Sequence, residues 1–161
     1  MAKALGLGYP GGPIIDRLFN SNYKKEFQFK CGKIGFDLSF SGIKTALIYK
    51  KLDLEKRGLL NRSVTIKMIS SFQEAIVDIL VATVLEATTK YRIKTVVCGG
   101  GVIANRYLRQ RLYDAESQGI RFFISPSQYA TDNAAMVAGL GFYLYNKKGV
   151  RSSLMLKAEA N

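Results

Sequence analysis

The chain has 161 residues, of which 48% are apolar, so it suits one folded domain with a sizeable core and is not a disordered chain. It carries 24 lysines and arginines against 12 aspartates and glutamates, and the net charge of +12 favours a polyanionic partner, most simply RNA or DNA, over an inert basic surface. The absence of histidine removes the commonest general base and transition-metal ligand from any mechanism housed wholly in this chain.

The sequence carries no signal for export or for a membrane. No apolar run reaches the roughly 18 residues that span a bilayer, and residues 1–5 lack the long apolar region of a secretory signal. The two cysteines, Cys31 and Cys98, form no zinc pattern and are interpreted as reduced packing residues. We therefore expect a cytoplasmic protein with no membrane partner.

The first twenty residues predict the end of one helix and the whole of another. Residues 2–5 look like the last turn of a helix that stops at Gly6, which suggests that the chain starts within an element. Turn chemistry follows at 9–13, where Pro13 suits the first turn of a helix ending near Asn20.

The next stretch predicts a β-hairpin followed by a helix. Apolar and polar residues alternate over 27–30 and again over 34–40, which indicates an antiparallel pair with a turn at 32–33. Residues 43–52 predict a helix, and the charged stretch 54–62 is interpreted as an exposed connection.

The longest periodic element is a core helix over 64–89, for which Ser63 is the expected N-cap. Its apolar face is formed by Ile69, Phe72, Ile76, Ile79, Leu80, Thr83 and Ala87.

Strands and helices then alternate to the end of the chain. We expect a strand over 92–98, and then a helix that Asn105 caps, that points Leu108 and Leu112 inward and that ends at Gly119. A strand over 120–124 follows. The last helix is expected to be capped by Thr131 or Asp132, to carry small residues for close packing and to end at Gly149. The strand–helix–strand unit between 95 and 124 should be a right-handed parallel crossover.

The stretch with the clearest chemistry is the glycine-rich turn at 99–101. A strand runs into three glycines, and Asn105 then opens a helix, so backbone N–H groups at the positive end of a helix dipole can face a nucleotide. The alternative is a strand-end turn without a ligand. The run fits neither the dinucleotide fingerprint nor the P-loop.

Four motifs occur in one order across nearly the whole chain. They are Tyr9-Pro10-Gly11-Gly12-Pro13, Ser39-Phe40-Ser41-Gly42-Ile43-Lys44-Thr45-Ala46, Gly99-Gly100-Gly101-Val102-Ile103-Ala104-Asn105 and Thr131-Asp132-Asn133-Ala134-Ala135-Met136. Together they resemble the universal tRNA threonylcarbamoyladenosine-modifying family, formerly labelled glycoprotease or O-sialoglycoprotein endopeptidase.

The resemblance implies an α/β fold of the actin/hexokinase/Hsp70-like (ASKHA) ATPase type, which has two ribonuclease H-like halves and a ligand between them. This chain resembles the C-terminal half, a mixed sheet flanked by helices over 1–149, with a mobile tail over 150–161. In the family, a pair of metal-binding histidines belongs to the N-terminal half, which we expect to be absent here. A ligand-binding aspartate comes just before the segment that residues 2–5 resemble, and this chain is expected to begin after it.

The resemblance also assigns roles to individual residues. Asp132 matches the carboxylate that holds a divalent metal ion, iron or zinc, in the intact protein; in this chain alone we expect it to be only an N-cap. Gly12, Gly100, Gly101 and Asn105 match positions beside the nucleotide, and for Asn105 capping is the alternative role. Ser41 and Lys44 match motif positions without an assigned chemistry.

The family's reaction moves a threonylcarbamoyl group from its adenylate to N6 of adenosine 37 in tRNA. The resemblance thus implies tRNA and companion proteins as partners, and threonylcarbamoyl-adenylate or ATP/ADP as ligand. We expect this chain alone to be inactive. The alternatives are a nucleotide- or tRNA-binding module, a self-associating half-domain, and a sugar or acetate kinase of the same fold. A protease is disfavoured, because the chain has no histidine that could pair with a nucleophile.

The resemblance also predicts self-association. Removing one half of a two-half fold leaves apolar residues of the other half facing water, and the candidates are Val102, Ile103, Met136 and the front of the last helix.

Overall fold

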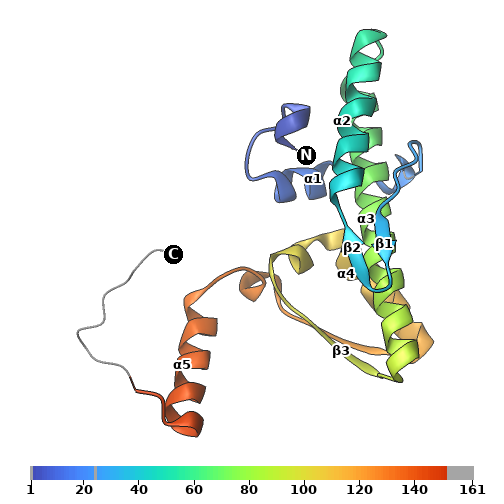
Figure 1. Ribbon diagram of the computed structural model, residues 1–161. Helices are drawn as coiled ribbons and strands as arrows, with labels where there is room; N and C mark the ends of the chain where they lie inside the picture. Colours follow the sequence, from blue (N-terminus) through green and yellow to red (C-terminus); the bar gives the residue numbers. More distant parts are fainter. Residues whose placement is uncertain (1, 24, 152–161) are drawn as a thin grey trace.

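The longest helix, α3 (Arg62–Tyr91), is the element against which most of the others pack (Figure 1). It is seen in a computed structural model that describes residues 2–23 and 25–151. The helix confirms the prediction over 64–89, but its N-cap is Asn61 rather than Ser63, because the Asn61 side chain accepts the N–H of Val64 at 3.0 Å.

By length and composition alone α3 could cross a membrane, and it is the one helix of the described residues that passes this test. More than half of its most apolar stretch, 56%, is buried against the rest of the chain. Because the core helix of a soluble protein passes the same test, the observation is weak evidence for a membrane span.

Helix α2 (Ser41–Lys56) packs along the first half of α3, where Ile43 and Leu47 are fully buried with Met68. The helix predicted over 43–52 is therefore correct but too short. The exposed connection predicted over 54–62 is too long: Leu54 is buried and the pair Lys51–Glu55 closes at 2.9 Å, so the helix runs on to Lys56. Residues 57–61 form the connection, as predicted.

The antiparallel hairpin is formed by β1 (Gly32–Ile34) and β2 (Asp37–Ser39). The predicted strand over 27–30 and turn at 32–33 are wrong. Gly32 lies in a strand opposite Ser39, and the turn falls at Gly35, whose φ of 59° suits glycine. The alternation of apolar and polar residues over 27–30 has another cause: Phe27 and Phe29 both pack against the core formed by α2 and α3.

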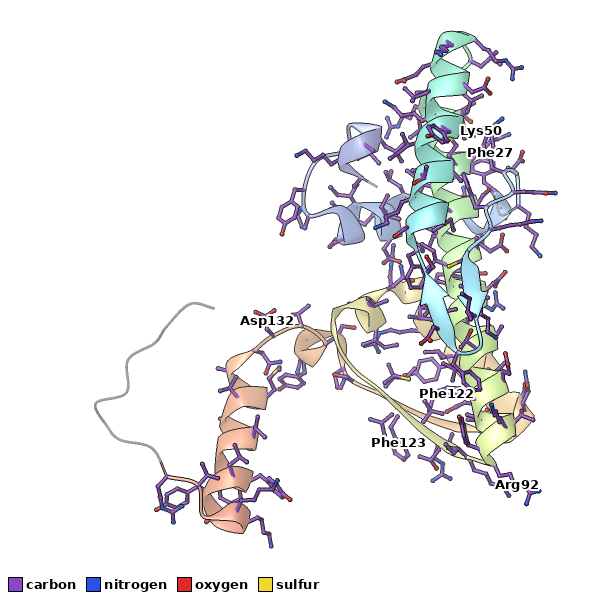
Figure 2. All side chains as sticks on the ribbon, viewed as in Figure 1. Phe27, Lys50, Arg92, Phe122, Phe123 and Asp132 are labelled. Atoms are coloured by element: carbon purple, nitrogen blue, oxygen red, sulfur yellow. The ribbon has the colours of Figure 1, made fainter. Side chains whose placement is uncertain are left out.

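Strands β3 (Thr95–Cys98) and β4 (Arg121–Ile124) form a parallel pair with Thr95 opposite Arg121 and Cys98 opposite Ile124. Helix α4 (Arg106–Ala115) makes the crossover, so the predicted parallel unit is confirmed, and its right-handedness stays a prediction. One sheet face packs on α3 and α4 through Phe122, whereas Phe123 points away from it (Figure 2). On this open face Val97 and Phe123 are 81% and 53% exposed.

The last helix, α5 (Ala134–Lys148), stands away from the other elements (Figure 1), and none of its described residues is buried. The expected close packing through its small residues is therefore not seen. Its N-cap is Asn133, which accepts the N–H of Met136 at 3.0 Å, so the prediction of Thr131 or Asp132 as cap is wrong. Its end at Gly149 is confirmed, and the tail predicted to be mobile lies from residue 152 outside the described residues.

The N-terminal segment packs on α3 as a short helix pair. A 3₁₀ turn, Lys3–Leu5, ends at Gly6 with φ 71°, and helix α1 (Gly11–Leu18) follows, as the sequence predicts. Ala2 and Ile15 are buried against Ile69 of α3. Among the described residues, further 3₁₀ turns are Ser21–Tyr23, Gly101–Ala104, Glu116–Gln118 and Ser127–Tyr129.

Candidate nucleotide-binding site

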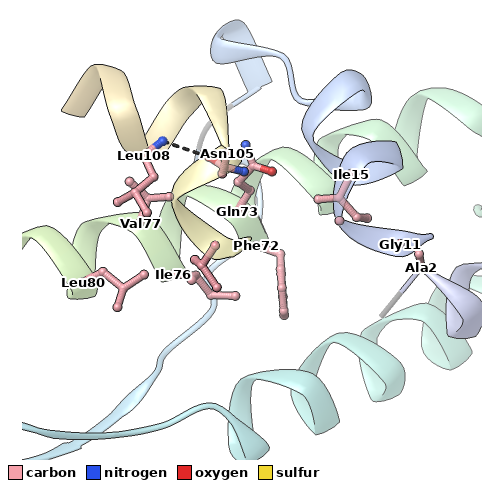
Figure 3. Close-up of a pocket in the computed structure, with 12 residues that line it drawn as sticks. Ala2, Gly11, Ile15, Phe72, Gln73, Ile76, Val77, Leu80, Asn105 and Leu108 are labelled. Atoms are coloured by element: carbon pink, nitrogen blue, oxygen red, sulfur yellow. Dashed lines mark hydrogen bonds between the residues drawn. The ribbon is translucent and has the colours of Figure 1, made fainter. Parts of the chain in front are cut away.

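A cavity of about 300 Å³ lies between α1, α3 and the start of α4 (Figure 3). Its wall is mostly apolar, with a few polar groups, which is the usual make-up of a small-molecule site. The lining residues are Ala2, Gly11, Gly12, Ile15, Phe72, Gln73, Ile76, Val77, Leu80, Val102, Asn105 and Leu108. The fold thus brings two predicted ligand residues, Gly12 and Asn105, to one cavity from distant parts of the sequence.

The first turn of α1 brings the backbone of Gly11 and Gly12 to the wall of this cavity. The helix starts at Gly11 after the extended Pro10, no side chain caps it, and its first turn has no acidic residue. Amide groups there carry the positive end of the helix dipole, so they suit an anion. A Cβ on Gly12 would meet nothing within 4 Å, whereas one on Gly11 would lie 2.9 Å from the Ala2 Cβ.

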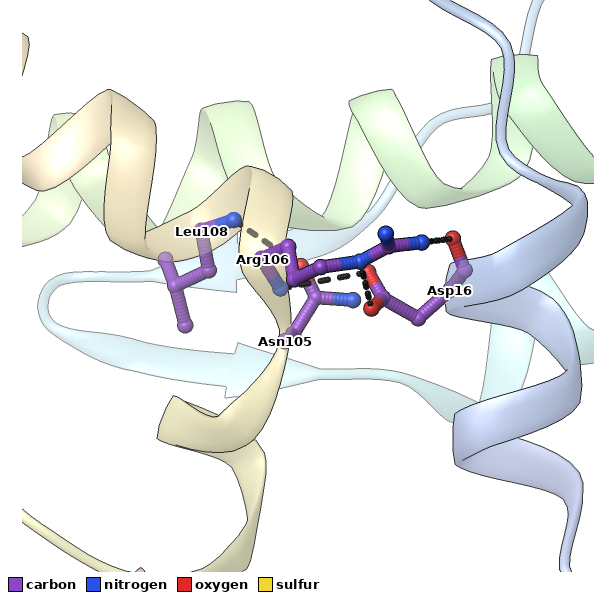
Figure 4. A network of polar contacts seen from close by, with 4 residues as sticks. All are labelled: Asp16, Asn105, Arg106 and Leu108. Atoms are coloured by element: carbon purple, nitrogen blue, oxygen red, sulfur yellow. Dashed lines mark hydrogen bonds and ion pairs between the residues drawn. The ribbon is translucent and has the colours of Figure 1, made fainter. Parts of the chain in front are cut away.

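Asn105 has a structural role that the sequence predicted. Its side-chain oxygen accepts the N–H of Leu108 at 2.8 Å and so caps α4 (Figure 4). The cap uses only the oxygen, and the carboxamide nitrogen of the same side chain keeps two donors for a ligand. Capping is confirmed, and the ligand contact stays a prediction.

Asp16 holds α1 against the start of α4, a role that the sequence analysis missed. Its carboxylate accepts the backbone N–H of Arg106 at 3.2 Å and the guanidinium Nε–H at 2.8 Å, while the Asp16 carbonyl accepts the same guanidinium at 2.9 Å (Figure 4). One turn further, Phe19 stacks on Tyr107 with ring centroids 4.4 Å apart. These contacts fix the position of Gly12 relative to Asn105. The only signal for them in the sequence is that Asp16 lies one helical turn after Gly12.

The glycine-rich turn lies beside the cavity rather than in its wall. Gly100 has φ 87°, a conformation that requires glycine, whereas a Cβ on Gly101 would touch only the Thr131 methyl group at 3.8 Å. Val102 reaches the cavity and is 69% exposed, as expected. Ile103, which was expected to face water, is only 4% exposed because it packs into the core with Leu108.

Comparison with known proteins identifies the family. The model of the tRNA N6-adenosine threonylcarbamoyltransferase family matches residues 1–139. The chain belongs to this family. The match favours this family over the sugar- and acetate-kinase alternative and confirms the resemblance of the four motifs.

Curated relatives with the name tRNA N6-adenosine threonylcarbamoyltransferase agree. The chain is 39% identical to that of Thermosipho africanus over 100% of its own length, 42% identical to that of Dictyoglomus turgidum over 98%, and 41% identical to that of Geobacillus thermodenitrificans over 98%. It covers 48%, 47% and 46% of these three relatives, so it spans about half of their length, and the match lies in their C-terminal half.

Asp132, expected to be the threonylcarbamoyltransferase metal ligand, lies exposed on the loop before α5 (Figure 2). The methyl group of Thr131, its neighbour, would lie 3.8 Å from a Cβ on Gly101, so the loop borders the glycine-rich turn. Within residues 2–23 and 25–151, no three histidine, cysteine, aspartate or glutamate side chains gather to hold a metal ion. One carboxylate does not make a metal site, so these residues alone do not fit the ion.

Two other motif positions lie away from the cavity. Ser41 begins α2, and its carbonyl accepts the Thr45 hydroxyl at 3.2 Å. Lys44 is exposed on the same helix. Neither residue lines the cavity, and nothing in the structure gives them a chemical role.

The geometry does not activate either cysteine as a nucleophile. Both are free, and burial raises the pKa of the Cys98 thiol at the end of β3 and of the Cys31 thiol before β1. A raised pKa keeps the thiol neutral near pH 7, and the thiolate is the nucleophilic form.

Proposed function

We propose that this chain is the C-terminal half of a tRNA N6-adenosine threonylcarbamoyltransferase, which transfers threonylcarbamoyl from its adenylate to N6 of adenosine 37 in tRNA. The observation that carries the proposal is the cavity that joins Gly12 and Asn105, two residues that match nucleotide-contacting positions of the family. The parallel β3–α4–β4 unit beside it is compatible with one ribonuclease H-like half of the ASKHA fold.

In this proposal the chain positions the adenylate or ATP/ADP rather than reacting with it. The first-turn amides of α1 bind phosphate oxygens, and the Asn105 carboxamide donates to the sugar or phosphate while its oxygen caps α4. Gly100 and Gly101, beside the cavity, are the proposed neighbours of a part of the ligand that extends out of it. Fixed donors of this kind supply orientation and electrostatic stabilisation to an acyl transfer.

The metal ion of the intact protein, iron or zinc, needs ligands beyond this chain. Asp132 provides one carboxylate, and a bound ion would supply an electrostatic anchor for substrate oxygens. Because the described residues form no metal cluster, no step of the reaction is assigned to the ion here.

The proposed partners of the chain are inferred from its net charge and from its family. A net charge of +12 favours tRNA binding, and companion proteins of threonylcarbamoyladenosine synthesis are the proposed protein partners of a cytoplasmic enzyme. A second candidate function, a self-associating half-domain without catalysis, is favoured by the apolar residues exposed on α5 and on the open face of β3–β4.

The test is threonylcarbamoyl incorporation into tRNA by this chain alone, with the full-length Dictyoglomus turgidum relative as control. We expect no turnover by the chain, because the histidine pair implied for the family does not occur in it. Turnover equal to that of the control would contradict the division of labour between two halves.

A further inference from the structure

A second cavity, of about 610 Å³, lies between α3 and the segment over residues 25–31. Its volume falls within the usual range of small-molecule sites. Glu74 and Asp78 of α3 line it. Ile76 and Leu80, on the same helix, line the cavity beside α1 and α4 instead. At 3.6 residues per turn the two pairs lie on opposite faces of α3, so the second cavity is separate from the proposed nucleotide site.

Glu74 is a buried carboxylate in the wall of this second cavity. Its residue is only 5% exposed, and it makes no hydrogen bond or ion pair to any of the described residues. Its two oxygens are nevertheless accessible. The buried, unbonded side-chain atoms that are sealed from solvent in the described part of the chain belong to Gln73, Thr83 and Arg109, and not to Glu74. A ligand in the cavity can therefore reach this carboxylate.

The polar neighbours of Glu74 on the same helix face have partners. Asp78, one turn further along α3, pairs with Arg111. The Ser71 hydroxyl, on the turn before, accepts the backbone N–H of Phe27 at 3.0 Å. The fold thus supplies a cation to Asp78 and none to Glu74. A buried carboxylate without a counter-charge destabilises a fold, so a positively charged ligand group is the partner that Glu74 lacks.

The segment over 25–31 brings positive charge and aromatic rings to the same cavity. Lys25 and Lys30 line it and are exposed, and neither ammonium group has an ion-pair partner among residues 2–23 and 25–151. Phe27 and Phe29 also line it. The Phe29 ring is held edge-on against Phe72, with centroids 5.9 Å apart. The cavity therefore offers one unpaired carboxylate, two unpaired ammonium groups and an aromatic wall.

We propose that the second cavity binds a free aromatic α-amino acid. The ammonium group of the ligand pairs with Glu74, and its carboxylate pairs with Lys25 and Lys30. Its ring packs on Phe27 and Phe29, in the offset or edge-on arrangements that aromatic pairs prefer.

Other classes of ligand leave part of this wall unsatisfied. A simple anion such as phosphate would pair with the two lysines but would leave Glu74 buried without a counter-charge. A simple amine or a polyamine would pair with Glu74 but would be repelled by Lys25 and Lys30. A zwitterion with an aromatic body satisfies all three kinds of group at once.

The test uses three ligands that differ by one charged group each. Ligand-observed NMR titration measures the Kd of the chain for L-phenylalanine, for 3-phenylpropanoate, which lacks only the ammonium group, and for phenethylamine, which lacks only the carboxylate. Glu74→Gln removes the negative charge at constant shape. Glu55→Gln, at an exposed glutamate of α2 outside the cavity, is the matched control. A double variant, Lys25→Gln with Lys30→Gln, removes the two positive charges.

We expect the unaltered chain and Glu55→Gln to bind L-phenylalanine about tenfold more tightly than 3-phenylpropanoate, because only the amino acid pairs with Glu74. In Glu74→Gln this preference should disappear. The preference over phenethylamine should be smaller, about threefold, because the lysines are exposed, and it should disappear in the double lysine variant. Without ligand, the Tm of Glu74→Gln should rise by about 2–4 °C, since an unpaired buried charge is removed.

The contrary results are equally definite. No binding of L-phenylalanine by the unaltered chain at about 10 mM overturns the site. Equal affinity for L-phenylalanine and 3-phenylpropanoate, or a preference between them that survives in Glu74→Gln, overturns the role of Glu74. Phenethylamine binding as tightly as L-phenylalanine overturns the assignment of an amino acid. None of these ligands is a nucleotide, so each result leaves the proposed function untouched.

Discussion

The residues around the cavity differ in how far the sequence could reveal them. Asn105 could be found, because a cap and its helix are adjacent in the chain and the Leu108 N–H lies three residues on. Asp16 could not, because its partner Arg106 is 90 residues away. Gln73 carried a local signal that was missed: it lies on the helix between the predicted core positions Ile69 and Ile76.

Asn105 offers a way to separate capping from ligand binding. In the full-length context, Asn105→Ala should lose about 1 kcal/mol of unfolding free energy with the cap and about 0.5–1.5 kcal/mol of nucleotide-binding free energy. Asn105→Ser keeps a capping oxygen but loses the amide donors, so only the affinity should fall. Calorimetry and thermal unfolding measure the two terms. Unchanged affinity in both variants would show that Asn105 is only a cap.

Cys98 gives a pH prediction of definite sign. Burial raises the pKa of its thiol, so the folded chain holds this proton more tightly than the unfolded chain does. The resulting stabilisation is complete below the pKa of the unfolded thiol and is lost as pH rises through the folded pKa. Alkylation of Cys98 in a Cys31→Ser background should reach half its maximal rate at a higher pH than in urea-unfolded chain. A midpoint at or below the unfolded value would contradict the buried thiol.

At the scale of elements, α1 connects the sequence motif to the site. It packs on α3 through Ile15 and is tied to α4 through Asp16, so its uncapped first turn is held at the cavity. The motif indicated a turn followed by a helix, but the direction in which the helix start points depends on contacts made with distant residues.

The adjacent glycines of α1 should respond in opposite ways to alanine. In Gly11→Ala the new Cβ would lie 2.9 Å from the Cβ of buried Ala2, so stability should fall by about 1–3 kcal/mol. In Gly12→Ala nothing lies within 4 Å, and stability should hold or rise by up to about 1 kcal/mol. The Gly12→Ala methyl group would enter the cavity, so nucleotide affinity should drop. Thermal unfolding and calorimetry on both variants check this, and normal affinity of Gly12→Ala would place the ligand elsewhere.

Elements with a clear local pattern were predictable, and the hairpin and one helix cap were not. The period of α3 and the strand–glycine–helix order of β3 and α4 are local patterns that tertiary structure preserves. The predicted hairpin strand over 27–30 is wrong because Phe27 and Phe29 alternate with polar residues for another reason. Both side chains pack on α2 and α3, and this pattern resembles that of a strand. At α5 three capping residues stand in a row, and only geometry selects Asn133.

The whole molecule combines a strong positive charge with uncovered apolar surface. Val97 and Phe123 on the open sheet face and Phe142 on α5 are 81%, 53% and 73% exposed. Surfaces of this kind commonly find partners, and the proposed function predicts the other half of a full-length protein or another copy of the chain as the cover. The covering partner cannot be predicted from the sequence of one half, because its residues lie outside that sequence.

Self-association should therefore increase with salt. Screening weakens the repulsion between chains of charge +12, whereas it weakens tRNA binding through loss of counterion release. Sedimentation of the chain alone and with tRNA, at about 50 mM and 200 mM salt, measures both signs. A monomer at micromolar concentration in both buffers would contradict the exposed-surface argument.

The most direct test of the account joins this chain to the N-terminal half of the Thermosipho africanus relative, in place of the half that it matches. Threonylcarbamoyl incorporation into tRNA is measured for the hybrid, for its Asn105→Ser variant and for the unaltered relative. We predict that the hybrid modifies tRNA and that the variant is about tenfold less active at limiting adenylate, because the lost donors weaken binding. A folded hybrid that binds tRNA but forms no threonylcarbamoyladenosine, while the relative does, would contradict the account.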